Sequence, residues 1–264
     1  MNVVTIPFVQ NIKDDIKNFI INKVNIKRVY IIGCSRSGTT MLHYAMIAFK
    51  NTMLFDKETN IWSHPSISEI FAIYKEKHNK TVPTFYVSKR HAEWYQDKEI
   101  YKSIEHISKY NIYVINIIRD PRDVLSSRHP YDKKRYYVEP WLWEKSVESA
   151  DFLMKKLGNY RNKLTIKYED IVLKSKMIEE KLIKILGLEL KDNIKSWNSL
   201  KDNLEESGVD HKMIPYMHKL RNFDKGSIGN WKNDEESKRY LENILKSSAY
   251  GKKIALFMEN YEYV

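Results

Sequence analysis

The segment KRVYIIG at residues 27–33 restricts the fold more than any other part of the sequence. It is apolar on both faces and ends at Gly33, a combination typical of a strand buried inside a parallel sheet. Gly38 follows after four intervening residues, and Thr39 and Thr40 then begin a stretch with apolar residues at helical spacing. A strand that runs through a short glycine loop directly into a helix predicts an α/β architecture.

The alternation of strands and helices continues along the chain. Further strands are predicted at 84–91, 111–118 and 163–172, with residues 51–68 irregular. Helices are predicted at 10–24, 39–50, 67–77, 98–110, 141–158 and 174–186, and within 234–260. This pattern predicts a three-layer fold, in which a central parallel β-sheet is flanked by helices. Because no repeat, low-complexity linker or Pro/Gly-rich boundary interrupts the sequence, residues 1–264 are expected to form a single domain.

Composition narrows the class of protein. Hydrophobic residues make up 42% of the chain, enough for a full core, which excludes global disorder. The net charge of +11 favours anionic ligands, although solvated lysine-rich helix faces are an alternative explanation. Cys34 is the only cysteine, so no intrachain disulfide can form. No run approaches the roughly 18 apolar residues of a membrane span, and residues 1–19 lack the pattern of a secretory signal. We therefore expect a soluble cytoplasmic protein.

The loop after the first strand predicts an anion site. Its glycines fit the phosphate-loop pattern G-x-x-x-x-G-K-[ST], except that Thr39 stands where the lysine belongs. Backbone N–H groups, the following helix N-terminus and the hydroxyls of Ser37, Thr39 and Thr40 supply donors. The cation of this loop is Arg36, inside the loop itself. Because the missing lysine normally serves the β- and γ-phosphates of a nucleotide triphosphate, the loop is suited to a shorter anionic group.

The segment RDPRDVLSSRH at residues 119–129 predicts a second anion contact. Asp120, Pro121 and Asp123 have a structural explanation, because they occupy the positions that begin and cap a helix. That explanation does not cover Arg119, which closes an apolar strand and therefore faces the crevice where α/β sheets bind ligands. Ser127 is expected about two turns into the following helix, where an arginine and a hydroxyl form a reasonable phosphate clamp.

Four motifs in order resemble those of the PAPS-dependent sulfotransferases. CSRSGTT resembles their 5′-phosphosulfate loop, RDPRDVLSS their 3′-phosphate motif, and IKYEDIV the strand and turn that place a tyrosine beside the cofactor. KGSIGNWKN resembles their C-terminal lysine–glycine loop. The resemblance, which has features of both the cytosolic and the protein-tyrosine sulfotransferases, covers residues 30–233. It implies a phosphate-loop core like that of the P-loop NTPases and binding of 3′-phosphoadenosine 5′-phosphosulfate (PAPS), with no metal.

The resemblance also implies roles for single residues. Arg36 is the candidate for the leaving-group side, and Lys89 for stabilising the transferring sulfuryl group. His91 is the favoured general base, as in cytosolic sulfotransferases, while Glu58 matches the glutamate base of the protein-tyrosine enzymes. The contacts expected for the nucleotide come from the loop (Arg36, Ser37, Gly38, Thr39, Thr40), the clamp (Arg119, Ser127), Tyr168 at the adenine or ribose, and Lys225 with Gly226 at the 3′-phosphate.

The C-terminal loop departs from the cytosolic pattern, because Asp224 stands where that pattern has an arginine. A carboxylate beside a phosphate is unfavourable, so either Arg221 substitutes or Asp224 points away. Trp231 is expected to be a packing anchor.

The acceptor is left open by the sequence, since aromatic residues beside cations suit sugar rings, phenols and acidic peptides alike. The family implies a glycan, a small alcohol or phenol, an amine or a tyrosyl peptide. Two other functions compete with sulfuryl transfer. An NTP-dependent kinase or NTPase would need a lysine at Thr39 and a carboxylate where Arg119 stands. A non-catalytic polyanion or nucleic-acid binder would explain the charge but not the order of the motifs.

Overall fold

The fold is taken from a computed structural model that describes residues 7–55, 58–62, 65–78, 85–91, 97–194, 214–215, 223–247 and 249–263. Within these residues the chain forms a five-stranded, all-parallel sheet in the order β2-β3-β1-β4-β5. The strands are β1 (Lys27–Gly33), β2 (Thr52–Leu54), β3 (Phe85–His91), β4 (Tyr113–Ile118) and β5 (Lys163–Lys167). The predicted central parallel sheet is confirmed.

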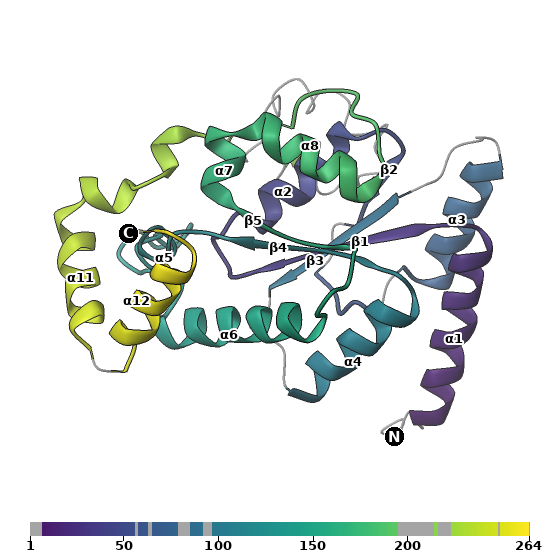
Figure 1. Cartoon of the computed structure of the whole chain (residues 1–264), viewed down its shortest axis with the longest axis horizontal. Helices are drawn as coiled ribbons and strands as arrows, with labels where there is room; N and C mark the ends of the chain where they lie inside the picture. Colours follow the sequence, from purple (N-terminus) through teal and green to yellow (C-terminus); the bar gives the residue numbers. More distant parts are fainter. Residues whose placement is uncertain are drawn as a thin grey trace.

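Helices cover both faces of this sheet (Figure 1). On one face lie α2 (Thr39–Ala45), α7 (Tyr168–Leu173) and α8 (Ser175–Leu186), and on the other α4 (Asp97–Lys109) and α6 (Pro140–Lys156). At one end of the sheet stand α1 (Pro7–Lys23) and α3 (Ile67–His78). At the other end are α5 (Pro121–Leu125), α11 (Glu235–Lys246) and α12 (Gly251–Asn260). The 3₁₀ turns are η1 (Met46–Ala48), η5 (Lys225–Ser227) and η6 (Asn230–Asn233).

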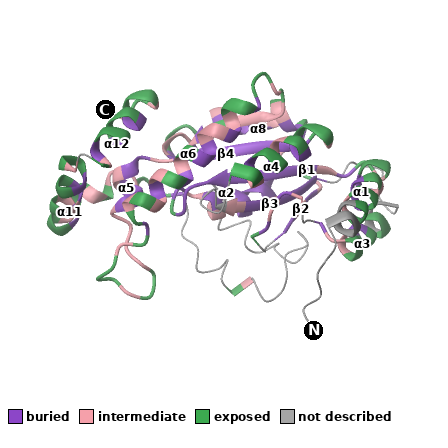
Figure 2. Cartoon of the chain, turned by 90° about the horizontal axis from the view of Figure 1, so that it is seen from below, coloured by how far each residue is buried: buried purple, intermediate pink, exposed green. Residues whose placement is uncertain are grey.

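The apolar run of β1 is explained by its position between β3 and β4. Alternate residues of a strand point to opposite faces, so Val29 and Ile31 belong to the cluster under α2 and α8. Tyr30 and Ile32 belong to the cluster under α4 and α6. Figure 2 shows the strands of the centre as the most buried part of the molecule. Because β1 has a partner strand on each side, the loop that follows it lies at the middle of the carboxyl end of the sheet.

Most predicted elements are confirmed, with small shifts at their ends. The first strand has the predicted bounds, and the terminal helical region consists of α11 and α12. The helix predicted at 39–50 is shorter than expected, because α2 passes into the 3₁₀ turn η1 after Ala45.

Two elements differ from the prediction. Strand β2 lies in the segment expected to be irregular, since three residues at a sheet edge are too few to show alternation. The last predicted strand ends at Lys167, and Tyr168 begins the helix α7. Glu169 and Asp170 stand in its first turn, where carboxylates favour a helix.

The predicted position of Ser127 within a helix is wrong. Helix α5 ends at Leu125, and the hydroxyl of Ser126 donates to the carbonyl of Arg122 at 2.6 Å. A serine that bonds back to the preceding turn competes with helix continuation. Ser127 therefore begins the loop that leads away from α5.

The close approach of β1 and β4 leads to a prediction about stability. A Cβ at Gly33 would collide with the carbonyl oxygen of Ile117, and the residue has a φ of +153°. We expect Gly33→Ala to lower the free energy of unfolding by about 2–4 kcal/mol, measured by urea denaturation. The matched control is Gly158→Ala, which has a positive φ but nothing within 4 Å of the added Cβ. It should cost only about 1–2 kcal/mol, and equal losses in the two variants would contradict the steric explanation.

Candidate functional site

The loop between β1 and α2 has an unusual backbone. Gly33, Arg36 and Gly38 all have positive φ, and the N–H of Ser37 donates to the carbonyl of Cys34 at 3.1 Å. A Cβ at Gly38 would lie 2.6 Å from the ring of Tyr168, so only glycine lets the loop approach α7 this closely. Three hydroxyl residues of the loop, Ser35, Ser37 and Thr39, are buried. The predicted Thr40 is half-buried.

Arg36 and Ser127 are in direct contact. The Nε of Arg36 donates to the hydroxyl of Ser127 at 2.7 Å, and its guanidinium lies 5.4 Å from the ring centre of Tyr137. Sequence analysis assigned the two residues to separate ends of a ligand. The structure joins them although they are 91 residues apart. The loop after β1 and the segment after β4 therefore form one continuous surface.

Arg119 closes β4 and connects three segments. It donates to the carbonyl of Arg36 at 2.9 Å and to the carbonyl of Ser227 at 2.5 Å. Its guanidinium also stacks on Tyr168, 4.4 Å from the ring centre. Its Nε is buried and has no hydrogen-bond partner in the part of the chain described above. The two predicted clamp residues, Arg119 and Ser127, are thus each joined to Arg36, the first through the backbone of Arg36 and the second through its side chain.

The segment around η5 completes this cluster from the C-terminal side. The hydroxyls of Tyr168 and Ser227 are 2.7 Å apart, and Tyr168 is buried. Asp224 accepts a hydrogen bond from the N–H of Gly226 at 3.0 Å, so its carboxylate caps the turn. Lys225 and Gly226 are exposed. Ser227, which sequence analysis did not single out, contacts both Tyr168 and Arg119. Arg221 lies outside the described residues.

The strand end that carries Arg119 is held by the last residues of the chain. Glu169 accepts from the N–H of Asp120 at 3.0 Å and from the hydroxyl of Tyr263 at 2.9 Å. Arg122 donates to the carbonyl of Tyr263 and stacks on Trp231, 4.9 Å from its ring centre. Trp231 packs against the cluster formed by α6, α11 and α12, as expected for a packing anchor.

Two carboxyl groups, the half-buried Glu169 and the buried Asp123, belong to this support. Burial raises the pKa of Glu169 and opposes the lowering effect of its hydrogen bonds. Burial likewise raises the pKa of Asp123, which accepts from the N–H of Gly229 at 2.8 Å. Both acids satisfy backbone N–H groups, so they hold the β4 end and the segment after η5 in place.

The candidate catalytic residues lie at the end of β3. The buried Lys89 donates to the carboxylate of the exposed Glu58 at 2.5 Å. His91 ends β3 beside Gly33, and its side chain lies outside the described residues. The structure thus brings Lys89 and Glu58 together. No contact between this pair and the Arg36 cluster is seen among the described side chains.

Sequence analysis did not consider His43, which lies close to Lys89. It is fully buried on α2 with a ring nitrogen 3.1 Å from the carbonyl of Val87. Burial lowers its pKa to about 3, with a further lowering by the charge of Lys89. The histidine is therefore neutral near pH 7 and suited to packing. The sequence signal for a buried histidine here was its position in a predicted helix among apolar neighbours.

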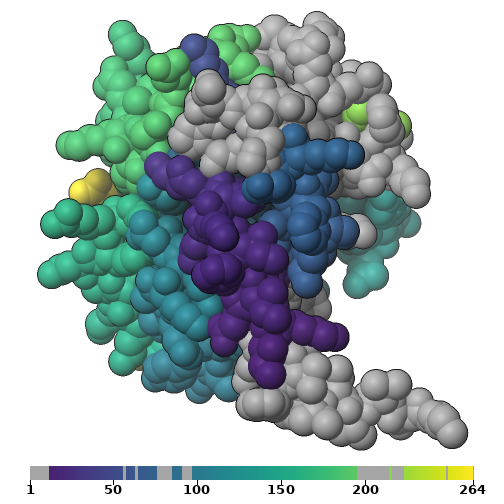
Figure 3. All heavy atoms as spheres, turned by 90° about the vertical axis from the view of Figure 1, so that its right-hand side faces the viewer, coloured from purple at the N-terminus to yellow at the C-terminus, as the bar shows by residue number. Residues whose placement is uncertain are grey.

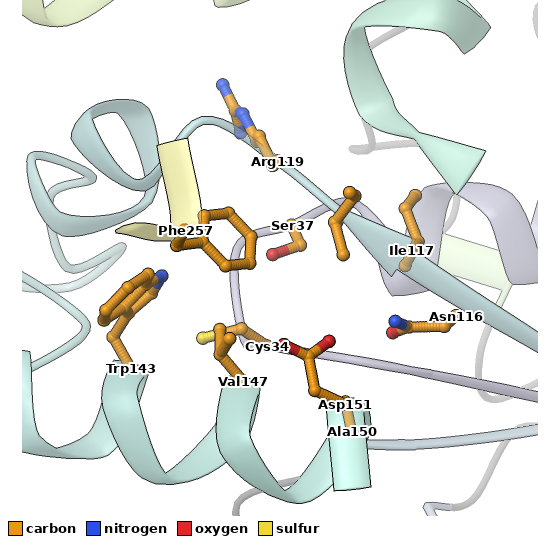
Figure 4. Close-up of a pocket in the computed structure, with 11 residues that line it drawn as sticks. Cys34, Ser37, Asn116, Ile117, Arg119, Trp143, Val147, Ala150, Asp151 and Phe257 are labelled. Atoms are coloured by element: carbon orange, nitrogen blue, oxygen red, sulfur yellow. The ribbon is translucent and has the colours of Figure 1, made fainter. Parts of the chain in front are cut away.

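A small cavity lies on the other face of the sheet, against α6 (Figure 4). It has a volume of about 10 Å³, room for one water, and is lined by Cys34, Asn116 and Asp151 among others. Both polar atoms of the Asn116 side chain are buried and have no protein partner among the described residues. In Figure 4 the guanidinium of Arg119 points away from this cavity. The cavity is too small for a nucleotide.

The described residues contain neither a membrane-spanning helix nor a cluster of metal ligands. No helix there is long and apolar enough to cross a membrane. The same residues contain no group of three or more His, Cys, Asp or Glu side chains placed to hold a metal ion.

Solved structures show what the fold is similar to. The sulfotransferase domain from the curacin biosynthetic pathway aligns over 82% of this chain and 96% of its own, at 14% identity and a TM-score of 0.51. The corresponding domain from the Synechococcus PCC 7002 olefin synthase aligns over 84% and 96%, at 15% identity and a TM-score of 0.50. These two structures show that the chain has the sulfotransferase fold, as the motifs predicted.

A mouse sulfotransferase crystallised with PAP aligns over 90% of this chain and 94% of its own, at 16% identity and a TM-score of 0.47. No protein-family model matches the sequence, and no curated protein matches it.

The half-buried Glu169 leads to a prediction about pH. Because its pKa is raised in the folded state, the folded chain keeps a proton that the unfolded chain releases. The stability contributed by this proton is complete below the ordinary pKa of 4.5 and is lost as pH rises through the raised value. Glu169→Gln should therefore gain stability relative to wild type as pH rises toward neutral, measured by urea unfolding across that range. The exposed Glu259→Gln should run parallel to wild type, and parallel curves for both variants would refute the assignment.

Proposed function

We propose that the chain is a PAPS-dependent sulfotransferase that transfers the sulfuryl group to an acceptor hydroxyl. The observation that carries this proposal is the 2.7 Å contact between Arg36 and Ser127, with Arg119 joined to the same loop. It unites the loop after β1 with the segment after β4, the two places where the sequence predicted anion contacts. The sulfotransferase fold is consistent with this function.

The residues of the cluster fit an adenosine bisphosphate. Arg36 and Arg119 supply cations, while Ser127 and Ser227 supply hydroxyls at the same surface. The buried Nε of Arg119 remains without a partner in the described structure, which fits an anionic ligand at this place. Tyr168 offers an aromatic ring beside it, suited to the adenine or ribose. Lys225, exposed on η5, is the remaining cation proposed for the 3′-phosphate, together with Gly226.

Asp224 supports this assignment. Its carboxylate is engaged by the N–H of Gly226, so it forms part of the turn. The aspartate thus has a structural role that accounts for its presence beside a phosphate site.

Arg119 also weighs against the kinase or NTPase alternative, because it stands where such an enzyme carries a carboxylate for Mg²⁺. In addition, Thr39 is buried at the position of the phosphate-loop lysine. Neither residue supplies what a triphosphate requires.

The proposed reaction is an in-line displacement at sulfur. The acceptor oxygen forms the new bond to sulfur while the bond from sulfur to the 5′-phosphate oxygen breaks. The proton of the acceptor hydroxyl passes to a general base, and the bisphosphate leaves with the electron pair. We assign Lys89 to the charge on the transferring group and Arg36, with Ser37, Gly38, Thr39 and Thr40, to the leaving group.

Two residues remain candidates for the base. His91 stands two residues after Lys89 at the end of β3, and a histidine titrates in a suitable range. Glu58 is supported by its contact with Lys89, which holds a carboxylate beside the proposed catalytic lysine. The acceptor hydroxyl belongs to a glycan, a phenol or alcohol, or a tyrosyl peptide.

Nucleotide binding gives the first test of this function. We expect 3′,5′-adenosine bisphosphate to raise the thermal midpoint of the protein, whereas Mg-ATP should not. Ser127→Ala removes one hydroxyl from the cluster and should weaken bisphosphate binding about tenfold, measured by calorimetry. Ser126→Ala is the matched control, because the hydroxyl of Ser126 bonds to α5. A shift with Mg-ATP alone would favour the NTPase alternative and contradict the proposal.

Turnover gives the second test, with labelled PAPS and a panel of glycans, phenols and peptides. The base variant, either His91→Ala or Glu58→Gln, should lose about 10²- to 10⁴-fold in kcat while bisphosphate affinity stays unchanged. Loss in His91→Ala identifies the histidine, and loss in Glu58→Gln identifies the glutamate. Full activity in both variants would exclude both assignments.

A further inference from the structure

Helix α1 is packed in an unexpected orientation. Its inner face buries two polar residues, Lys17 and Asn18, which are only 5% and 1% exposed. The ammonium of Lys17 donates to the carbonyl of Trp62 at 2.7 Å, and the amide of Asn18 donates to the carbonyl of Asp14 at 2.6 Å. Burial lowers the pKa of Lys17 to about 8, which shows how far this ammonium is removed from water. Two polar residues of α1 thus lie on the side of the helix that faces the core.

The outer face of α1 carries apolar residues instead. Ile12, Ile16 and Phe19 are spaced by four and three positions, so they form one stripe along the helix. All three are exposed, and Phe19 has 67% of its surface open to solvent. The inner face also holds the buried Ile21, so α1 carries apolar residues on both faces, whereas an amphipathic helix on the surface of a single chain keeps them toward the core. This orientation is explained if a further surface covers the outer stripe.

Helix α3 repeats the pattern beside α1. Ile67, Phe71 and Tyr74 have the same spacing and are exposed, with Phe71 at 59%. The inner face of α3 is conventional, because Ile70 and Ile73 are buried in the cluster shared with Ile21 of α1. Figure 3 shows the two helices side by side on one face of the molecule. The two stripes lie on neighbouring helices, and we call these six residues the α1–α3 face.

We propose that the α1–α3 face is the contact surface between two copies of this chain in solution. Its six large side chains, each about half exposed, present on the order of 500 Å², at the upper end of what single soluble chains expose. Two such faces together bury about 1,000 Å² before any polar rim is counted, which is the lower bound for a biological interface.

The matching stripes explain why a second copy is the fitting occupant. In a two-fold contact, if one residue of the first copy touches another residue of the second copy, then symmetry makes the same contact with the two copies exchanged. The stripes on α1 and α3 have equal length and equal spacing. Helix α1 of one copy can therefore lie on α3 of the other, and the symmetry repeats the same contact.

The test measures the mass of the protein in solution by light scattering after size-exclusion chromatography. Wild type should elute as a pair of 31.6 kDa chains at micromolar concentration. Phe19→Glu places two unpaired charges in the pair and should weaken it by more than about a hundredfold, giving a single chain. Phe71→Glu should do the same from the other helix, and it decides the matter if Phe19→Glu fails to fold, as judged by circular dichroism.

The matched control is Leu256→Glu, which places the same charge at a position 57% exposed on α12, at the opposite end of the sheet. This variant should remain a pair. A wild type that is a single chain, or variants of both helices that remain paired, would overturn the proposal. A single-chain wild type that sediments with phosphatidylcholine vesicles would overturn it in favour of a membrane surface.

Discussion

The site depends above all on one planar cation at the end of the sheet. Arg119 reaches carbonyl oxygens 83 and 108 residues away in sequence and stacks on Tyr168 at the same time. A guanidinium can donate to two carbonyl oxygens in fixed directions. The loop after β1, helix α7 and the turn η5 are therefore positioned by the same side chain. A lysine would bring one ammonium and could not hold all three segments in this way.

Arg119 is itself held in place by the distant end of the chain. Glu169 accepts hydrogen bonds from the N–H of Asp120 and the hydroxyl of Tyr263. The residue next to Arg119 is therefore connected to the segment that follows α12. Keeping a carboxyl group in this partly buried place costs free energy, which the raised pKa of Glu169 records. That cost is offset by satisfying a backbone N–H at the strand end. The C-terminal helices thus belong to the support of the site as well as to the fold.

The sequence predicted those features that are determined by residues close together along the chain. Strand β1 was predicted because a run buried on both faces shows in composition, and Arg119 because a charge at the end of such a run has no local explanation. The contact of Arg36 with Ser127 was not predicted, since it depends on where α5 ends, and that is decided by a single serine bonding back to its helix. The role of Ser227 likewise depends on a tertiary hydrogen bond, the one that its carbonyl accepts from Arg119. Spacing along a chain carries no information about such contacts.

The length of the sheet separates the two surfaces to which roles have been given (Figure 1). The arginine cluster draws on the ends of β1 and β4 and on segments beside β5, toward α11 and α12. The α1–α3 face stands at the other end of the strands, where the inner sides of its helices pack against Met53, Phe55 and Tyr86. The hydrogen-bonded strands run between the two surfaces, and no described residue of α1 or α3 contacts the arginine cluster. Association through α1 and α3 would therefore produce two sites of the same kind, each made by a single chain.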